Sequence, residues 1–166
     1  MSTILVTPGG SVGSPLGLPA GRAFRALRWV GLLLAAVTAV DILLVFVPLQ
    51  WSNPDWRLAS VVQTLGGMPV LAVGLGAVTA SAAALGERGV ARAMLVVHLV
   101  VALAIVALLA TFVPVAMDAV SIAREGWMSD VGRAAIRTIA YALIFGTLHV
   151  LLALASRRAA QGGAAA

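Results

Sequence analysis

The stretch that decides the fold is residues 93–117, AMLVVHLVVALAIVALLATFVPVAM, which contains no Asp, Glu, Lys or Arg. About 20 apolar residues in an α-helix are enough to cross the hydrocarbon core of a bilayer. This stretch therefore predicts a membrane-spanning helix. The whole chain agrees with it, because 61% of its 166 residues are hydrophobic and 10% are charged, whereas about a quarter of the residues in a water-soluble domain are charged.

Three further apolar stretches have the length and composition of crossings. The uncharged stretch between Arg57 and Glu87 is interrupted by Gly66, Gly67 and Pro69, and the residue before a proline disfavours helical angles. This interruption predicts a short surface helix followed by a separate crossing. The predicted crossings are residues 29–51, 69–85, 93–117 and 134–156, and the predicted interfacial helices are residues 54–65 and 118–133.

The fold class predicted from these stretches is an all-α polytopic membrane protein with four crossings in an antiparallel bundle. Residues 22–158 would form the transmembrane domain. Residues 1–21 are rich in Gly, Pro, Ser and Thr, and residues 159–166 are of low complexity, so we expect a flexible tail at each end.

Arginine placement predicts the direction of the crossings. Three arginines precede the first crossing, two lie between the second and third, and two follow the fourth. Basic residues near helix ends favour the cytoplasmic side, so we expect both termini in the cytoplasm and the chain in the inner membrane. Tryptophan favours the membrane–water interface, and Trp56 and Trp127 fall on the predicted surface segments as candidate interfacial contacts.

The two halves of the chain resemble each other. A shift of 66 residues aligns Arg22 with Arg88, Gly66 with Gly132, and the Phe-Val-Pro at residue 46 with that at residue 112. A parallel tandem duplication of two hairpins predicts this pattern. Chance matching between two apolar sequences is the alternative.

The first loop and the return into the second crossing, PLQWSNPDWRL at residues 48–58 and MPVLAVGL at residues 68–75, resemble the small four-pass HpsJ-like membrane proteins. The shared features are an apolar exit, a loop bearing tryptophan and a Pro-Leu-Gly-Leu type of return, mainly over residues 43–76. The resemblance implies a four-helix membrane protein with an accessory, non-catalytic character.

One acidic residue lies inside a predicted crossing. Asp41 is 13 residues from Arg28 and ten from Trp51, which predicts a position near the middle of the membrane. A charged aspartate there costs about 3 kcal/mol on insertion scales, so we expect it to be protonated, paired or facing water. Thr79 and Tyr141 are predicted at similar depth as hydrogen-bond partners. A proton or ligand site and a neutral interhelical hydrogen bond are the two interpretations.

Two histidines have matching depths on neighbouring crossings. His98 lies six residues after Arg92, and His149 lies eight residues before Arg157. The two helices would run in opposite directions, so both imidazoles are expected about 9 to 12 Å below the cytoplasmic surface. Equal depth is what the two axial ligands of a b-type haem require. The alternative is a histidine hydrogen bond across a helix interface, with no cofactor bound.

The residue inventory narrows the function classes. The chain has no cysteine and no lysine, so thiolate and Schiff-base chemistry are excluded. No metal-ligand cluster or catalytic constellation is visible, and the arginines are too scattered to form a nucleic-acid surface. We therefore expect a non-enzymatic accessory subunit whose partners are the bilayer and other membrane subunits or a second copy. A haem electron carrier and a small proton-linked carrier using Asp41 are the alternatives.

Overall fold

A computed structural model describes residues 20–122 and 125–162, with side chains described for residues 20–121 and 130–162. It consists of four long helices, α1 (Ala20–Val45), α2 (Pro54–Ala84), α3 (Arg88–Ile122) and α4 (Glu125–Gln161), and the described residues form no strand. Each helix is long and apolar enough to cross a membrane. The predicted all-α class with four membrane-spanning helices is therefore confirmed.

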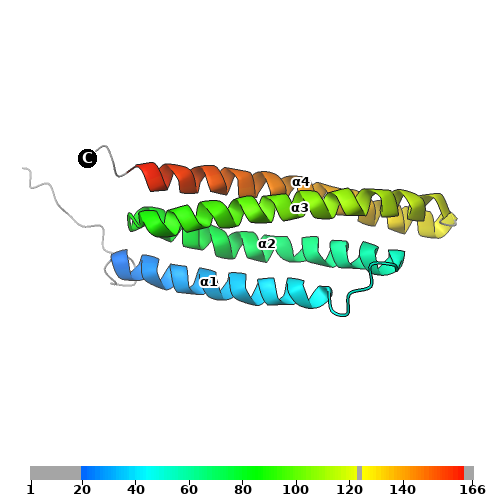
Figure 1. Cartoon of the computed structure of the whole chain (residues 1–166), viewed down its shortest axis with the longest axis horizontal. Helices are drawn as coiled ribbons and strands as arrows, with labels where there is room; N and C mark the ends of the chain where they lie inside the picture. The colour runs from blue at the N-terminus through cyan, green and yellow to red at the C-terminus, as the bar shows by residue number, and fades with distance from the viewer. Residues whose placement is uncertain (1–19, 123–124, 163–166) are drawn as a thin grey trace, which may run out of the picture.

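The four helices lie side by side along one axis, and successive helices are joined at alternate ends (Figure 1). Helix α2 packs against all three others, α3 and α4 pack against each other, and α1 contacts α2 alone. Half of the most apolar 18-residue window of α2 is buried, compared with 17% of that of α1. The molecule is therefore a three-helix core, α2–α3–α4, with α1 attached to one side of it.

The ends of α2 follow from local sequence. The side-chain oxygen of Asn53 accepts hydrogen bonds from the backbone amides of Asp55 and Trp56, and Pro54 occupies the first helical turn, where its missing N–H costs nothing. At the other end Gly86 has a φ of 68°, which glycine adopts readily. Its amide donates to the carbonyl of Ala83, and a sharp turn leads into α3.

The predicted break in the second apolar stretch is wrong. Helix α2 runs continuously from Pro54 to Ala84 with Pro69 inside it, so residues 54–65 are not a separate interfacial helix. A proline inside a helix removes one hydrogen bond, but neighbouring helices allow membrane helices to tolerate this loss. Helix α2 has such neighbours on three sides.

Other predicted boundaries also change. Helix α1 ends at Val45 rather than at residue 51, and residues 46–53 form the connection to α2. The segment 118–133 is not one surface helix, because its first residues continue α3 and its last residues begin α4. Residues 20–21 and 159–161, expected in the tails, are helical, whereas residues 1–19 and 163–166 lie outside the described part.

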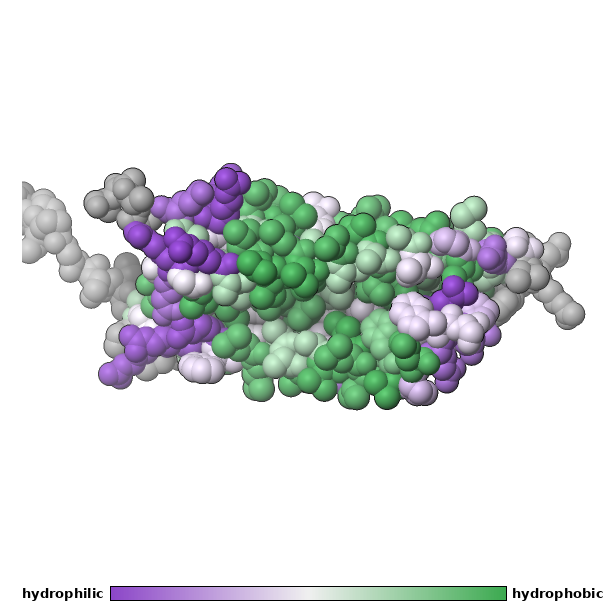
Figure 2. Space-filling model, viewed as in Figure 1, coloured by the Kyte–Doolittle hydropathy of each residue, from purple (hydrophilic) through white to green (hydrophobic). Residues whose placement is uncertain are grey.

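The surface has the polarity expected for a chain in a bilayer. Figure 2 shows an apolar belt around the middle of the visible face, with hydrophilic residues gathered toward both ends. Large apolar side chains are exposed on all four helices, among them Leu33, Val73, Leu103 and Leu143. Water would make such a surface unfavourable, and lipid makes it favourable.

Candidate functional site

The most polar point inside the core is a pair of histidines. His98 on α3 and His149 on α4 both have no solvent-exposed surface, and their Nδ1 atoms are 2.9 Å apart in a hydrogen bond. The Nε2 atom of His98 lies 2.9 Å from the hydroxyl oxygen of Thr79 on α2. The Nε2 atom of His149 has no hydrogen-bond partner. These three side chains, here called the histidine chain, thus connect all three core helices.

The helical periodicity of the sequence accounts for this meeting. Side chains three or four residues apart share one face of a helix, and His98 lies on the buried face of α3 between Met94 and Ala102, while His149 lies on that of α4 between Ala142 and Ala153. The depths calculated from the flanking arginines are nearly equal. The sequence-based depth estimate therefore agrees with the contact that the structure shows.

The geometry of the pair does not fit a b-type haem. Two imidazole nitrogens that bind one metal ion from opposite sides are about 4 Å apart, because each bond to the metal is about 2 Å long. The Nδ1 atoms of His98 and His149 are closer than this, and their ring centroids are 5.2 Å apart with the rings tilted by 39°. A macrocycle has no room between rings in direct contact.

The described side chains also include no group of three or more His, Cys, Asp or Glu residues placed to hold a metal ion. The interpretation of an interhelical histidine hydrogen bond therefore fits this site, and the haem interpretation does not.

Thr79 and Tyr141 do not serve Asp41. The hydroxyl of Thr79 is used by His98, and the ring of Tyr141 packs edge-on against Phe145, with centroids 5.8 Å apart. Both residues belong to core helices that face away from α1, which contacts only α2. The sequence gave their depth but not the direction in which each side chain points.

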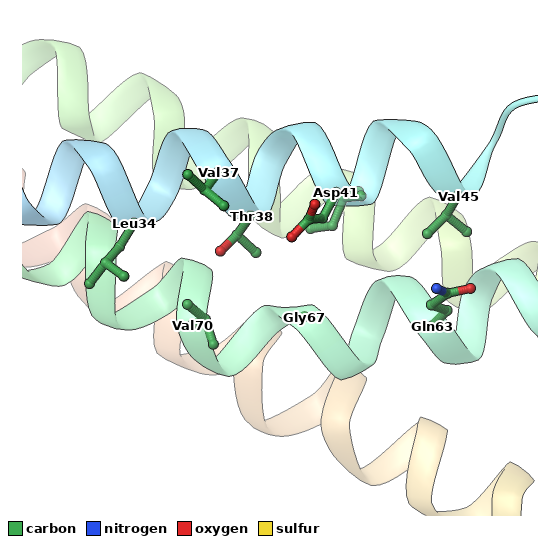
Figure 3. A pocket seen from close by; sticks show the side chains of 9 residues that line it. Leu34, Val37, Thr38, Asp41, Val45, Gln63, Gly67 and Val70 are labelled. Carbon is green, nitrogen blue, oxygen red and sulfur yellow. The ribbon is translucent and has the colours of Figure 1, made fainter.

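Asp41 lies at the edge of a hollow between α1 and α2 (Figure 3). The hollow has a volume of about 290 Å³. Figure 3 shows Thr38 and Asp41 from α1 and Gln63 from α2 directed into the space between the two helices. Asp41 and Gln63 are both exposed. No hydrogen bond or ion pair joins Asp41 to another side chain in the described parts of the chain.

The hollow is nearer to one end of the bundle than predicted. Asp41 lies four residues before the end of α1 at Val45, or about 6 Å along the axis. The connection that follows is marked by aromatic contacts, since Trp56 packs edge-on against Phe46 and Trp51, with centroids 6.0 and 5.7 Å away. Such a cluster is typical of a membrane–water interface. Asp41 therefore lies one to two turns inside that interface and not at mid-membrane.

The two predicted interfacial tryptophans differ in what can be said of them. Trp56 belongs to the aromatic cluster at the start of α2. Trp127 lies in the first turn of α4, and its side chain is outside the described residues.

A close contact between α1 and α2 lies on the cytoplasmic side of the hollow. A Cβ atom added to Gly31 would be 2.6 Å from the carbonyl oxygen of Gly74, and one added to Gly74 would be 2.8 Å from that of Gly31. Glycine at both positions lets the two backbones touch. Sequence analysis did not single out Gly74 as a packing residue. The signal available was its position among the small residues of the second crossing.

Four apolar helices of membrane-spanning length define the chain as a helical multi-pass membrane protein. Comparisons of the chain with known protein families, curated protein sequences and solved structures found no match. The resemblance to HpsJ-like proteins therefore stays a prediction.

Proposed function

We propose that this protein is a non-catalytic accessory subunit of a larger membrane complex, and that it docks against a membrane-spanning helix of another subunit through the hollow between α1 and α2. The observation that carries the proposal is the exposed carboxylate of Asp41 inside an apolar helix. A carboxylate facing lipid near the bilayer centre costs about 3 kcal/mol, less toward the interface, unless a partner or water satisfies it.

Charge complementarity selects the occupant of the hollow. Apart from Asp41, Thr38 and Gln63, the lining side chains are apolar, and they include Leu34, Val37 and Val70. An apolar helix with one basic side chain at the depth of Asp41 would cover these residues and neutralise the carboxylate. Polar and small residues at helix interfaces are the usual means of association in lipid, where no hydrophobic force drives helices together.

The proposed orientation has both ends of the bundle's chain on the cytoplasmic side of the inner membrane, with the helices antiparallel. Support comes from seven of the eleven arginines, which lie at or beyond the helix ends where α1 begins, α2 meets α3 and α4 finishes. Fusions of a cytoplasm-dependent fluorescent reporter to the C-terminus would fluoresce if this orientation is right, and periplasmic reporters at that position would be inactive.

Site-specific cross-linking tests the docking surface. The chain has no cysteine, so a photo-cross-linker attached at Val70→Cys is unique and lies on the exposed rim of the hollow. The expected result is an adduct with one other membrane protein that carries a basic residue in a crossing. Leu103→Cys, 70% exposed on α3, is the matched control and should give no such adduct.

Two further variants connect the adduct to the carboxylate. Asp41→Asn should reduce the Val70→Cys adduct at least severalfold, and so should a neutral replacement of the partner's basic residue. Asp55→Asn, which removes an exposed carboxylate from the first turn of α2, should leave the yield unchanged. An adduct between two copies of this chain, an adduct with lipid alone, or equal yields from both cysteines would overturn the proposal.

The proton-linked carrier is the competing proposal for the same residue, and the open hollow beside Asp41 is the observation that favours it. A carrier site must stay accessible to its substrate and so cannot be filled by a partner helix. It predicts that Asp41→Asn abolishes the cellular phenotype while Val70→Cys forms no protein adduct.

A further inference from the structure

The histidine chain restricts where protons can be placed. A hydrogen bond between two Nδ1 atoms needs one donor and one acceptor, so one of the two atoms carries hydrogen and the other does not. A neutral imidazole carries a single N–H. The 2.9 Å contact between His98 and His149 therefore fixes both tautomers as soon as one of them is chosen.

Two neutral arrangements satisfy this requirement. In the first, His98 donates through Nδ1, Thr79 donates its hydroxyl hydrogen to Nε2 of His98, and Nε2 of His149 carries hydrogen. In the second, His149 donates through Nδ1, His98 donates through Nε2 to the oxygen of Thr79, and Nε2 of His149 is a bare lone pair. Both arrangements are compatible with the distances, because a hydroxyl both donates and accepts.

One additional proton fits the same geometry. Adding it to the bare Nε2 of His149 gives a cation in which the Nδ1–H···Nδ1 bond is kept and His98 still donates to Thr79. Both hydrogen bonds then become charge-assisted, which makes them about twice as strong as neutral ones. A second additional proton does not fit, because two Nδ1–H groups would point at each other across 2.9 Å.

No other charge competes for this proton within the core. The described helices carry no charged side chain between Arg57 and Glu87 on α2, between Arg92 and Asp118 on α3, or between Arg137 and Arg157 on α4, where Tyr141 is the one other titratable group. Helix α1 does not contact α3 or α4. The pair itself must therefore carry the charge.

We propose that His98 and His149 form a binding site for a single proton inside the bundle, shared as an N–H···N cation and positioned by the hydroxyl of Thr79. The site goes beyond the accessory role, since it lies in the α2–α3–α4 core and does not involve the α1–α2 hollow. Intramembrane histidines that bind protons are a known means of coupling membrane proteins to pH.

Nitrogen NMR of ¹⁵N-histidine-labelled protein in lipid bilayers tests this proposal directly. The expected result is one transition, common to both imidazoles and worth one proton, with scalar coupling between the two Nδ1 nuclei on both sides of it. Two independent one-proton transitions, absence of the N–N coupling, or no transition of either residue down to the pH at which the bundle unfolds would overturn the proposal.

Variants of the third member separate a positioning role from a merely structural one. Thr79→Val removes the acceptor for the Nε2–H of His98 and should lower the proton affinity of the pair by up to about tenfold, the equivalent of one hydrogen bond. Thr79→Ser keeps the hydroxyl and should restore the transition. Thr147→Val, on the exposed face of α4, should leave it unchanged. A Thr79→Val protein that titrates like the wild type would exclude the positioning role.

Discussion

The α1–α2 contact and the α2–α3–α4 core are held together by different means. Helix α1 touches α2 through backbone, because Gly31 and Gly74 have no side chains to separate the two helices. The core is closed by large apolar side chains such as Leu65, Ile105 and Phe112, and it is crossed by the histidine chain. The first contact depends on the absence of atoms, and the second depends on their presence.

The difference has a consequence for function. The core satisfies most of its polar groups internally, and at its centre only Nε2 of His149 lacks a partner. The α1–α2 face leaves Asp41 and Gln63 exposed. A region that is closed in itself suits a proton site, whereas a region that leaves a carboxylate toward lipid suits a partner.

The largest effect is expected for Gly74→Leu. Its Cβ atom would lie 2.8 Å from the carbonyl oxygen of Gly31 and 2.9 Å from the amide nitrogen of Ala35, so α1 must move away from α2. Overpacking of this kind costs about 1–3 kcal/mol of unfolding free energy, which SDS titration in mixed micelles can measure.

Gly76→Leu is the matched control for this substitution. It lies two residues further along the same helix, and a Cβ atom there meets nothing within 4 Å. It should change the unfolding free energy by less than about 0.5 kcal/mol. Equal losses from the two variants would show that α1 does not pack on Gly74.

A smaller effect is expected in the core, from replacing the histidines. His98→Leu leaves two groups without partners, Nδ1 of His149 and the hydroxyl of Thr79, whereas His149→Leu leaves only Nδ1 of His98. We expect a loss of about 1–2 kcal/mol for His98→Leu and less for His149→Leu.

The double variant sharpens this expectation. Once His98 is absent, replacing His149 removes two unpaired nitrogens instead of breaking a hydrogen bond. The double variant should therefore be no less stable than His98→Leu alone, with a coupling energy of roughly 1 kcal/mol. Strictly additive losses would mean that the two imidazoles do not interact.

Much of the fold could be predicted from the sequence, because lipid imposes a strong requirement on length and hydropathy. Four spanning helices and the start of α2 at Pro54 were predicted, the latter from the Asn-Pro-Asp signal. The break at Pro69 was wrong because the rule applied there describes local backbone preference. Packing of α2 against three neighbours outweighs that preference.

The site was predictable in depth and not in direction. Flanking arginines placed His98 and His149 at one level, and the helical period turned both toward the core. The same calculation placed Thr79 near Asp41, although Thr79 faces α3 and bonds His98. Which face of α2 meets α1 is decided by the contact at Gly74, and this needs the three-dimensional packing of two helices rather than the period of one.

The smallest effect is expected where α1 is tied to the turn between α2 and α3. Arg28 forms an ion pair with Glu87, and both side chains are partly exposed, at 20% and 33%. Glu87→Gln should lower the unfolding free energy by about 0.2–1 kcal/mol at low salt and by less at 1 M salt, because exposed pairs are screened. Asp130→Asn is the matched control, since its pair with Arg133 is exposed at 64% and 75% and joins residues of one helix. It should have no measurable effect on the attachment of α1. If Glu87→Gln changed stability as much as Gly74→Leu, the ion pair and not the glycine contact would be what holds α1 to the core.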